Sequence, residues 1–216
     1  MHIVITGASS GIGEALAIEL AKSPKNKLTL IARRETLLKE LCHKVGKNSH
    51  YIVADLSDLD TCTQFVDEAE KKSGPIDVMI NNAGIQRVGR TLELGYTEGE
   101  KLIRLNTLSP LKIIDFILPK MLKRGSGMIV NVASIAAFHP TPYMYYYSAS
   151  KAAFGSASES LNLELKEEPV HILTVYPGPI ATPMETRVKD IYEDSFLVDQ
   201  FPSGDPTELA KRLLKR

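Results

Sequence analysis

The sequence predicts an α/β protein with one doubly wound parallel sheet. Short apolar runs rich in β-branched residues recur along the chain, and longer stretches with helical spacing separate them. The runs stay apolar at successive positions, as strands do when helices cover both faces of a parallel sheet. The chain has 216 residues and no composition break typical of a linker, so residues 1–216 are expected to form a single domain.

Six apolar runs and five helical stretches follow one another along the chain. The predicted strands are His2–Thr6, Leu28–Ala32, Tyr51–Ala54, Ile76–Ile80, Met128–Val132 and Ile172–Tyr176. The predicted helices are Ile12–Lys22, Glu35–Val45, Leu59–Lys72, Glu98–Lys123 and Ser148–Glu167. Strands that alternate with helices become parallel neighbours in a doubly wound sheet. The periodicity weakens after Pro183, so residues 183–205 are expected to be a flexible substrate loop, followed by an amphipathic piece from Pro206 to Arg216.

The composition excludes several classes of partner. Lys plus Arg and Asp plus Glu both number 26, so no net field attracts a nucleic acid. Cys42 and Cys62 lie outside metal-ligand spacings, and neither a metal site nor a secreted disulfide scaffold is predicted. No apolar run approaches the roughly 18 residues that span a bilayer, and Met1 leads directly into a predicted strand. The protein is therefore expected to be cytoplasmic, with no membrane partner.

A glycine-rich turn follows the first predicted strand. Residues 6–13 read Thr-Gly-Ala-Ser-Ser-Gly-Ile-Gly, and a helical pattern begins at once. Glycines allow close backbone approach, and a helix N-terminus presents free N–H groups to a pyrophosphate. A plain glycine-rich connection would have the same residues, and the spacing departs from G-x-G-x-x-G. The turn predicts dinucleotide binding by Gly7, Ser9, Ser10, Gly11, Ile12 and Gly13.

The end of the second predicted strand indicates which nucleotide would bind. A carboxylate there would accept from a ribose 2′-hydroxyl, but this chain has Arg33 and Arg34. A guanidinium pairs with a 2′-phosphate, so these residues favour NADP(H) over NAD(H), unless they are two solvated arginines. Asp55, which precedes Leu56 after the third strand, could accept from the adenine amino group, or could cap the next helix.

A tyrosine and a lysine four residues apart form a candidate proton-transfer pair. Tyr147 and Lys151 lie on one face of a predicted helix, and a nearby ammonium lowers the pKa of a phenol. A packed tyrosine beside a surface lysine is the alternative. Ser134 follows the fifth strand, at the sheet edge where ligands of such folds collect. Its hydroxyl could donate to a carbonyl oxygen, or could cap a loop.

Together these motifs resemble the short-chain dehydrogenase/reductase family, and the matches run in family order from residue 6 to about 182. The family has a Rossmann-type domain that binds a nicotinamide dinucleotide. The matching residues are Thr6-Gly7-Ala8-Ser9-Ser10-Gly11-Ile12-Gly13, Asn81-Asn82-Ala83-Gly84, Asn106, Ser134, Tyr147-Ser148-Ala149-Ser150-Lys151, Pro177-Gly178 and Thr182.

The resemblance implies a role for each residue of the reaction centre. Tyr147 would protonate a carbonyl oxygen as hydride arrives, and would deprotonate the alcohol in the reverse direction. Lys151 would hold the nicotinamide ribose and lower the pKa of Tyr147. Ser134 would orient and polarise the carbonyl, and Asn106 would hold a water that links Lys151 to solvent.

The resemblance also implies further cofactor contacts. Ile180 and Thr182 would fix the nicotinamide carboxamide. The remaining expected contacts line the adenosine side or flank the nicotinamide; they are Leu56, Asn82, Ala83, Gly84, Tyr147, Lys151, Pro177 and Gly178.

The proline after Asn106 gives the water site support from the sequence itself. Pro110 lacks an N–H, so the helix bond to the Asn106 carbonyl cannot form. A freed carbonyl needs a partner, and water is the natural one. Alternatively, Pro110 only kinks the helix, or Asn106 ends it.

Two features depart from the family pattern. Members that prefer NADP often carry a basic residue where this chain has Ser10, so a phosphate would be held by Arg33, Arg34 and hydroxyls such as Ser9. Members also usually add a seventh strand, which is missing here, leaving six.

The helices that carry Asn106 and Tyr147 could pair in a homodimer. Small residues such as Ala152 and Ala153 would allow close approach across a two-fold axis, although they also suit packing within one subunit. The expected function is hydride transfer between NADP(H) and a small carbonyl or alcohol substrate. The alternatives are a catalytically silent dinucleotide-binding regulator or scaffold, and a nucleotide-binding domain for other chemistry such as methyl transfer.

Overall fold

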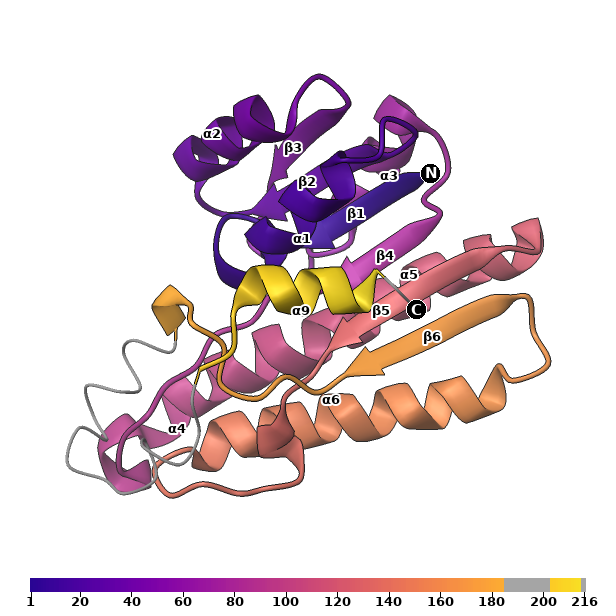
Figure 1. Ribbon diagram of the computed structural model, residues 1–216. Coiled ribbons are helices and arrows are strands. Elements are labelled where there is room, and N and C mark those ends of the chain that lie inside the picture. Colours follow the sequence, from indigo (N-terminus) through magenta and orange to yellow (C-terminus); the bar gives the residue numbers. More distant parts are fainter. Residues whose placement is uncertain (185–202, 215–216) are drawn as a thin grey trace.

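The computed structural model describes residues 1–184 and 203–214 and contains one six-stranded parallel sheet (Figure 1). The strand order is β3-β2-β1-β4-β5-β6. Strands β2 and β3 are added on one side of β1, and β4, β5 and β6 are added on the other, so the order of winding reverses between β1 and β4. In such folds ligands bind beside this reversal, at the carboxyl ends of the strands. The predicted doubly wound, six-stranded architecture is confirmed for the described residues. The strands are β1 (His2–Thr6), β2 (Lys27–Ala32), β3 (Ser49–Val53), β4 (Val78–Asn81), β5 (Gly127–Val132) and β6 (Val170–Val175).

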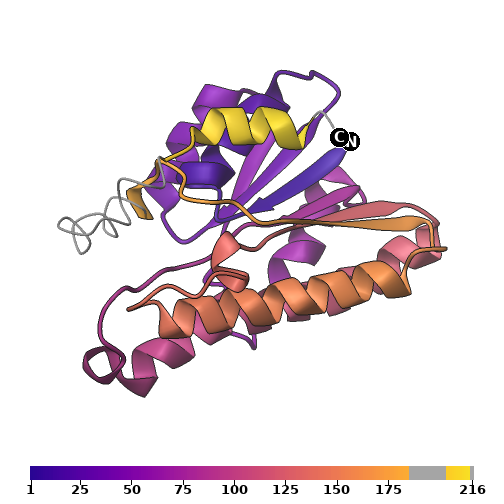
Figure 2. The same cartoon turned by 60° about the horizontal axis from the view of Figure 1, so that its bottom comes forward.

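Helices cover both faces of the sheet, as Figure 2 shows for α6 and α9 on opposite sides. One face carries α1 (Gly11–Ala21), α2 (Glu35–Val45) and α9 (Pro206–Leu213). The other face carries α3 (Gln64–Ser73), α5 (Ser109–Arg124) and α6 (Tyr145–Glu164). Helix α4 (Thr91–Ile103) packs against α6 near its amino end.

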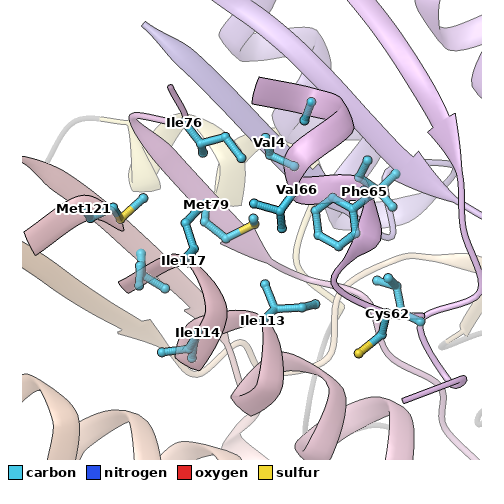
Figure 3. Packing of buried hydrophobic residues seen from close by; sticks show 14 of the residues in the cluster. Val4, Cys62, Phe65, Val66, Ile76, Met79, Ile113, Ile114, Ile117 and Met121 are labelled. Atoms are coloured by element: carbon cyan, nitrogen blue, oxygen red, sulfur yellow. The ribbon is translucent and has the colours of Figure 1, made fainter. Parts of the chain in front are cut away.

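The two hydrophobic layers explain the continuously apolar strands. In β1, Ile3 and Ile5 face the cluster under α1 and α2, whereas Val4 faces the cluster under α3 and α5. Figure 3 shows this second cluster, where Val4 and Met79 of the sheet meet apolar side chains of α3 and α5. Both faces of each central strand are thus removed from water. Burying one such side chain contributes about 1.5–3 kcal/mol.

The predicted helix from Leu59 begins only at Gln64. Two carboxylates make turns before it: Asp55 Oδ1 accepts from Ser57 N at 3.0 Å, and Asp58 Oδ1 accepts from Asp60 N at 3.0 Å. Such side-chain bonds compete with helical ones. The helix-cap interpretation of Asp55 is therefore wrong, since Thr63 is the residue before α3.

The predicted helix Glu98–Lys123 consists of three pieces in the structure. Helix α4 begins upstream at Thr91 and is broken at Gly95, whose φ of 68° is left-handed. A π-helical turn, η1 (Arg104–Leu108), follows, and then α5. Gly99 of α4 packs directly on the Tyr146 ring, because any Cβ at residue 99 would overlap that ring.

Pro110 explains the π-helical turn. It cannot donate to the Asn106 carbonyl, and the chain accommodates this by widening the turn, so that Ser109 N donates to the Arg104 carbonyl five residues back. The interpretation that Pro110 disturbs the helix is confirmed. The alternative that Asn106 ends the helix is wrong, because helical geometry continues into α5.

Two histidines, the buried His2 and the partly buried His50, connect the amino ends of three strands. His2 Nδ1 lies 2.7 Å from the Gly74 carbonyl, which can only accept, so Nε2 must accept from the Thr29 hydroxyl at 2.8 Å. The Thr29 oxygen then accepts from His50 Nε2 at 2.9 Å. Burial lowers the pKa of His2. Burial lowers the pKa of His50 as well, and with the positive charges of Lys72 and His2 nearby this pKa falls to about 4.

The free energy of unfolding is expected to fall by about 1–2 kcal/mol as the pH drops from 6.5 to 4, after allowance for the partial exposure of His50. Between these values the unfolded chain binds a proton that folded His50 does not, so stability decreases toward acid and levels off below pH 4. Urea unfolding across this range measures the slope. His50→Gln should flatten it and the exposed-site control His171→Gln should not; equal slopes would rule out this assignment.

Candidate active site

A cavity of about 760 Å³ opens at the carboxyl ends of the strands, where the strand order reverses. Of the residues proposed from the sequence, Gly13 and Asn106 do not line it, and both are buried beside it. The others all line it: Gly7, Ser9, Ser10, Gly11, Ile12, Arg33, Arg34, Asp55, Leu56, Asn82, Ala83, Gly84, Ser134, Tyr147, Lys151, Pro177, Gly178, Ile180 and Thr182. One cavity therefore joins the glycine-rich turn to the Tyr147–Lys151 pair.

The loop after β4 supports the glycine-rich turn from behind. Thr6 Oγ1 donates to the Ile80 carbonyl at 3.1 Å and accepts from the backbone N–H groups of Asn82 and Ala83. Asn82 Nδ2 donates to the carbonyls of Thr6 and Gly7 at 2.9 and 3.2 Å. The Asn82 side chain thus holds the turn, and its backbone lies at the cavity wall.

Glycine is required where this turn meets its neighbours. A Cβ at Gly13 would lie 2.5 Å from the Gly7 carbonyl oxygen and 2.6 Å from Asn82 Nδ2. At Gly11, whose φ is +62°, a Cβ would lie 3.1 Å from Thr182. The turn and the segment after β6 therefore approach closely. Gly13 acts by this packing, not by lining the cavity.

Two arginines line the cavity close to the end of β2. Arg34 Nη2 donates to Ser9 Oγ at 2.8 Å and to Ser10 Oγ at 2.7 Å, and Arg33 Nη1 lies 3.7 Å from Asp55 Oδ2. Partial burial opposes the charge of Asp55, but hydrogen bonds from Ser57 and the Arg33 guanidinium keep its pKa below the usual value. Arg34 is therefore held at the turn by two hydroxyls, while both arginines remain exposed to solvent.

Three functional groups meet at the other end of the cavity. The Tyr147 phenol lies beside Ser134; burial raises the pKa of Tyr147, and the neighbouring Ser134 hydroxyl opposes the rise. Ser134 Oγ also accepts from Ala136 N at 3.2 Å, so the residue caps a short 3₁₀ turn as well. Both side chains are nearly buried. Two hydroxyls are thus placed side by side facing one cavity.

The Lys151 ammonium is directed at the sheet. It donates to the Val132 carbonyl at 2.9 Å, and burial lowers its pKa to about 8. The expectation that Lys151 lowers the pKa of Tyr147 is not met, because burial of the phenol is the dominant effect and Lys151 bonds to the backbone. The interpretation of Lys151 as a surface lysine is also wrong, since it is 5% exposed.

Asn106 is a buried clamp beside the cavity. Its Oδ1 accepts from Ile85 N at 2.9 Å, and its Nδ2 donates to the Ile85 carbonyl at 2.9 Å and to Ser150 Oγ at 3.0 Å. Both amide hydrogens are therefore used by the protein. A water that donates a hydrogen bond to Asn106 could therefore bind its backbone carbonyl or the second lone pair of Oδ1, but no amide hydrogen is left to donate to that water. Ser150 was not among the sequence-predicted site residues, although it lies inside the Tyr-x-x-x-Lys motif.

The lining fits a dinucleotide. The turn presents backbone at one end, and Gly84 lies at the other, where a Cβ would reach 3.2 Å from Asn106 Oδ1 and 3.5 Å from Lys151 Nζ. Arginines follow β2 on one side of the cavity, and the hydroxyl donors Ser134 and Tyr147 lie on the other. Backbone amides suit the phosphates of a dinucleotide, and cations suit a ribose phosphate. Hydroxyl donors suit a reacting carbonyl group.

Comparison with known proteins agrees with this geometry. The profile of the short chain dehydrogenase family matches residues 1–192. An uncharacterized oxidoreductase of Staphylococcus saprophyticus is 35% identical over 214 residues, covering 93% of this chain and 91% of the relative. The chain belongs to the short-chain dehydrogenase/reductase family. Members of this family bind nicotinamide dinucleotides.

Further relatives of this short-chain dehydrogenase are enzymes of several kinds. A fatty acyl-CoA reductase of Mycobacterium tuberculosis is 36% identical over 195 residues, covering 87% of this chain and 66% of the relative. A variant of actinorhodin polyketide ketoreductase, solved with NADPH, superposes with a TM-score of 0.89 at 29% identity, covering 99% of this chain and 88% of that one. No helix within residues 1–184 and 203–214 has the length and apolarity to span a bilayer.

Proposed function

We propose that this short-chain dehydrogenase is an NADP(H)-dependent oxidoreductase that interconverts a carbonyl group and an alcohol in a small molecule. The observation that carries the proposal is that Ser134, Tyr147 and Lys151 line one cavity, which also has two arginines at its far end. The substrate end has apolar walls from Ile135, Ala136 and Met144, which suit a small carbonyl compound.

Each residue would act at a stated atom. The nicotinamide, when bound, supplies or accepts the hydride. Ser134 donates a hydrogen bond to the carbonyl oxygen and polarises it. In reduction, Tyr147 donates its hydroxyl proton to the same oxygen; in oxidation, it accepts the proton of the alcohol. A proton donor or acceptor positioned in this way accelerates a reaction by about 10²–10⁴-fold. Lys151, still an ammonium below pH 8, would hold the nicotinamide ribose.

The NADP preference rests on the arginines at the end of β2. Arg33→Ala is expected to weaken NADPH binding at least tenfold and NADH binding less than twofold, because only NADPH brings a 2′-phosphate to pair with the guanidinium. Fluorescence titration of both nucleotides measures the change. Arg212→Ala, an exposed arginine of α9, is the control for loss of one positive charge. Equal losses for the two nucleotides would contradict the preference.

The direct test is a cofactor titration followed by a panel of aldehydes, ketones and alcohols, monitored at the nicotinamide absorbance. Turnover with NADPH that exceeds turnover with NADH supports the proposal. Tight nucleotide binding without turnover on the whole panel would favour the silent regulator instead.

We also propose a homodimer through α5 and α6 and a cytoplasmic location. Exposed apolar side chains on these helices include Phe116 and Leu163, at 36% and 74% exposure. Gly155, by contrast, packs against the Tyr176 ring of its own subunit, because a Cβ at residue 155 would lie 2.9 Å from that ring.

The cytoplasmic proposal rests on Cys42 and Cys62, which are both free thiols.

A further inference from the structure

Ser150 lies in the catalytic turn of α6 but faces away from the cavity. It sits between Tyr147 and Lys151, is fully buried and does not line the cavity. Its Oγ accepts from Asn106 Nδ2 at 3.0 Å and donates to the Tyr147 carbonyl at 2.7 Å. One hydroxyl therefore connects the backbone of the proposed proton donor to the π-helical turn.

A second bond joins the same two elements. Thr107 Oγ1 donates to the Ser150 carbonyl at 2.9 Å. Asn106 and Thr107 are adjacent in η1, so this turn of α6 is fixed to η1 through both the hydroxyl and the carbonyl of Ser150. Asn106 also holds both backbone groups of Ile85, a residue of the cavity wall. Helix α6, η1 and the loop after β4 thus meet at Ser150 and Asn106.

We propose that Ser150 is a positioning residue that fixes the register of α6 on the π-helical turn, and thereby the Tyr147 hydroxyl and the Lys151 ammonium. The proposal rests on the proposed function. Residues three and four apart in a helix share a face, so a displacement of this turn moves both groups together. The Lys151 bond to the Val132 carbonyl reaches from α6 to β5, and the place of Tyr147 beside Ser134 in the cavity lining depends on the same register.

Ser148 supplies a matched control. It lies two residues away on the same helix and is nearly as buried, but its hydroxyl has no hydrogen-bond partner among the described residues. Removing either hydroxyl makes the same small change in side-chain volume. Only Ser150→Ala removes bonds to Asn106 and Tyr147.

The experiment compares Ser150→Ala and Ser148→Ala with the wild type in NADPH binding and in carbonyl reduction across pH. Ser150→Ala should lower kcat about tenfold and leave the Kd for NADPH within twofold. It should also move the alkaline limb of the kcat profile to higher pH, because water that reaches Lys151 stabilises its ammonium. Tyr147 is the titratable group on the same turn of α6, and the variant also relaxes its burial; Arg87 and His139 line the same cavity from other elements. Ser148→Ala should leave all three within twofold.

Several outcomes would overturn the proposal. Equal effects of the two variants on kcat and on the pH profile would do so. A loss of NADPH binding or stability with kcat unchanged would show a purely structural role for Ser150. If Ser150→Ala does not fold, Thr107→Val removes the second bond and should lower kcat in the same direction; an unchanged kcat would contradict the proposal. Absence of turnover in the wild type would instead refute the proposed function, and this proposal with it.

Discussion

Tyr147→Phe is expected to reduce carbonyl turnover by about 10²–10⁴-fold while the Kd for NADPH changes less than twofold. The variant keeps the ring, which packs in the small cluster with Leu102 and Met144, and removes only the hydroxyl that meets Ser134. The carbonyl oxygen would then lose its proton donor, whereas the dinucleotide contacts remain. Steady-state kinetics and nucleotide titration on the same preparation separate these two effects.

Tyr145→Phe is the matched control for this prediction. Tyr145 lies on the same helix two residues earlier, but it is 62% exposed and does not line the cavity. Its loss of a hydroxyl should leave kcat within twofold. If Tyr147→Phe retained more than about a tenth of the wild-type turnover, proton transfer by this phenol would be refuted.

Lys151→Met is expected to make the protein more stable and inactive. Burial lowers the pKa of Lys151 to about 8, so at pH 7 the buried ammonium costs about 3 kcal/mol relative to the unfolded chain. Methionine has a similar length and no charge, but it leaves the Val132 carbonyl without this donor, which costs about 1–3 kcal/mol. A net gain of about 1 kcal/mol in the free energy of unfolding should appear in urea titrations, together with a loss of at least 10²-fold in turnover.

The gain should depend on pH in one direction. The pKa of Lys151 is about 8 in the folded protein and near 10.5 in the unfolded chain. The stability advantage of the variant over the wild type is therefore largest below pH 8. As the pH rises from 8 to 10.5, folded Lys151 loses its proton before the unfolded chain does, and the advantage of methionine shrinks. The exposed Lys39→Met serves as control. A variant less stable than the wild type at pH 7, or an advantage that grows with pH, would contradict this prediction.

Much of the fold could be predicted because its signals are local. Strand β1 and helix α2 have the predicted bounds, since continuous apolar runs and helical spacing are properties of short segments. The start of α3 and the extent of α4 were predicted wrongly. Their positions depend on carboxylate turns at Asp55 and Asp58, and on a left-handed Gly95 that joins two helical pieces.

The site could be predicted as a set of positions but not as a set of bonds. The glycine turn, Ser134, Tyr147 and Lys151 follow from motif spacing, and the structure brings them to one cavity. The acceptor of Lys151 is a carbonyl 19 residues away, a contact that no motif encodes. The role of Ser150 could likewise not be predicted, because its partners Asn106 and Thr107 lie 44 and 43 residues away on another helical segment.

The widened turn at η1 also makes the number of residues in this segment critical. Deleting one residue between Arg104 and Leu108 would remove the extra residue of the widened turn, and Pro110 would then be forced against the carbonyl four residues before it. The deletion would also rotate everything upstream by about 100° and shorten the segment by about 1.5 Å. Gly99 would then no longer face the Tyr146 ring. A single-codon deletion here should thus be more damaging than most substitutions at the same positions.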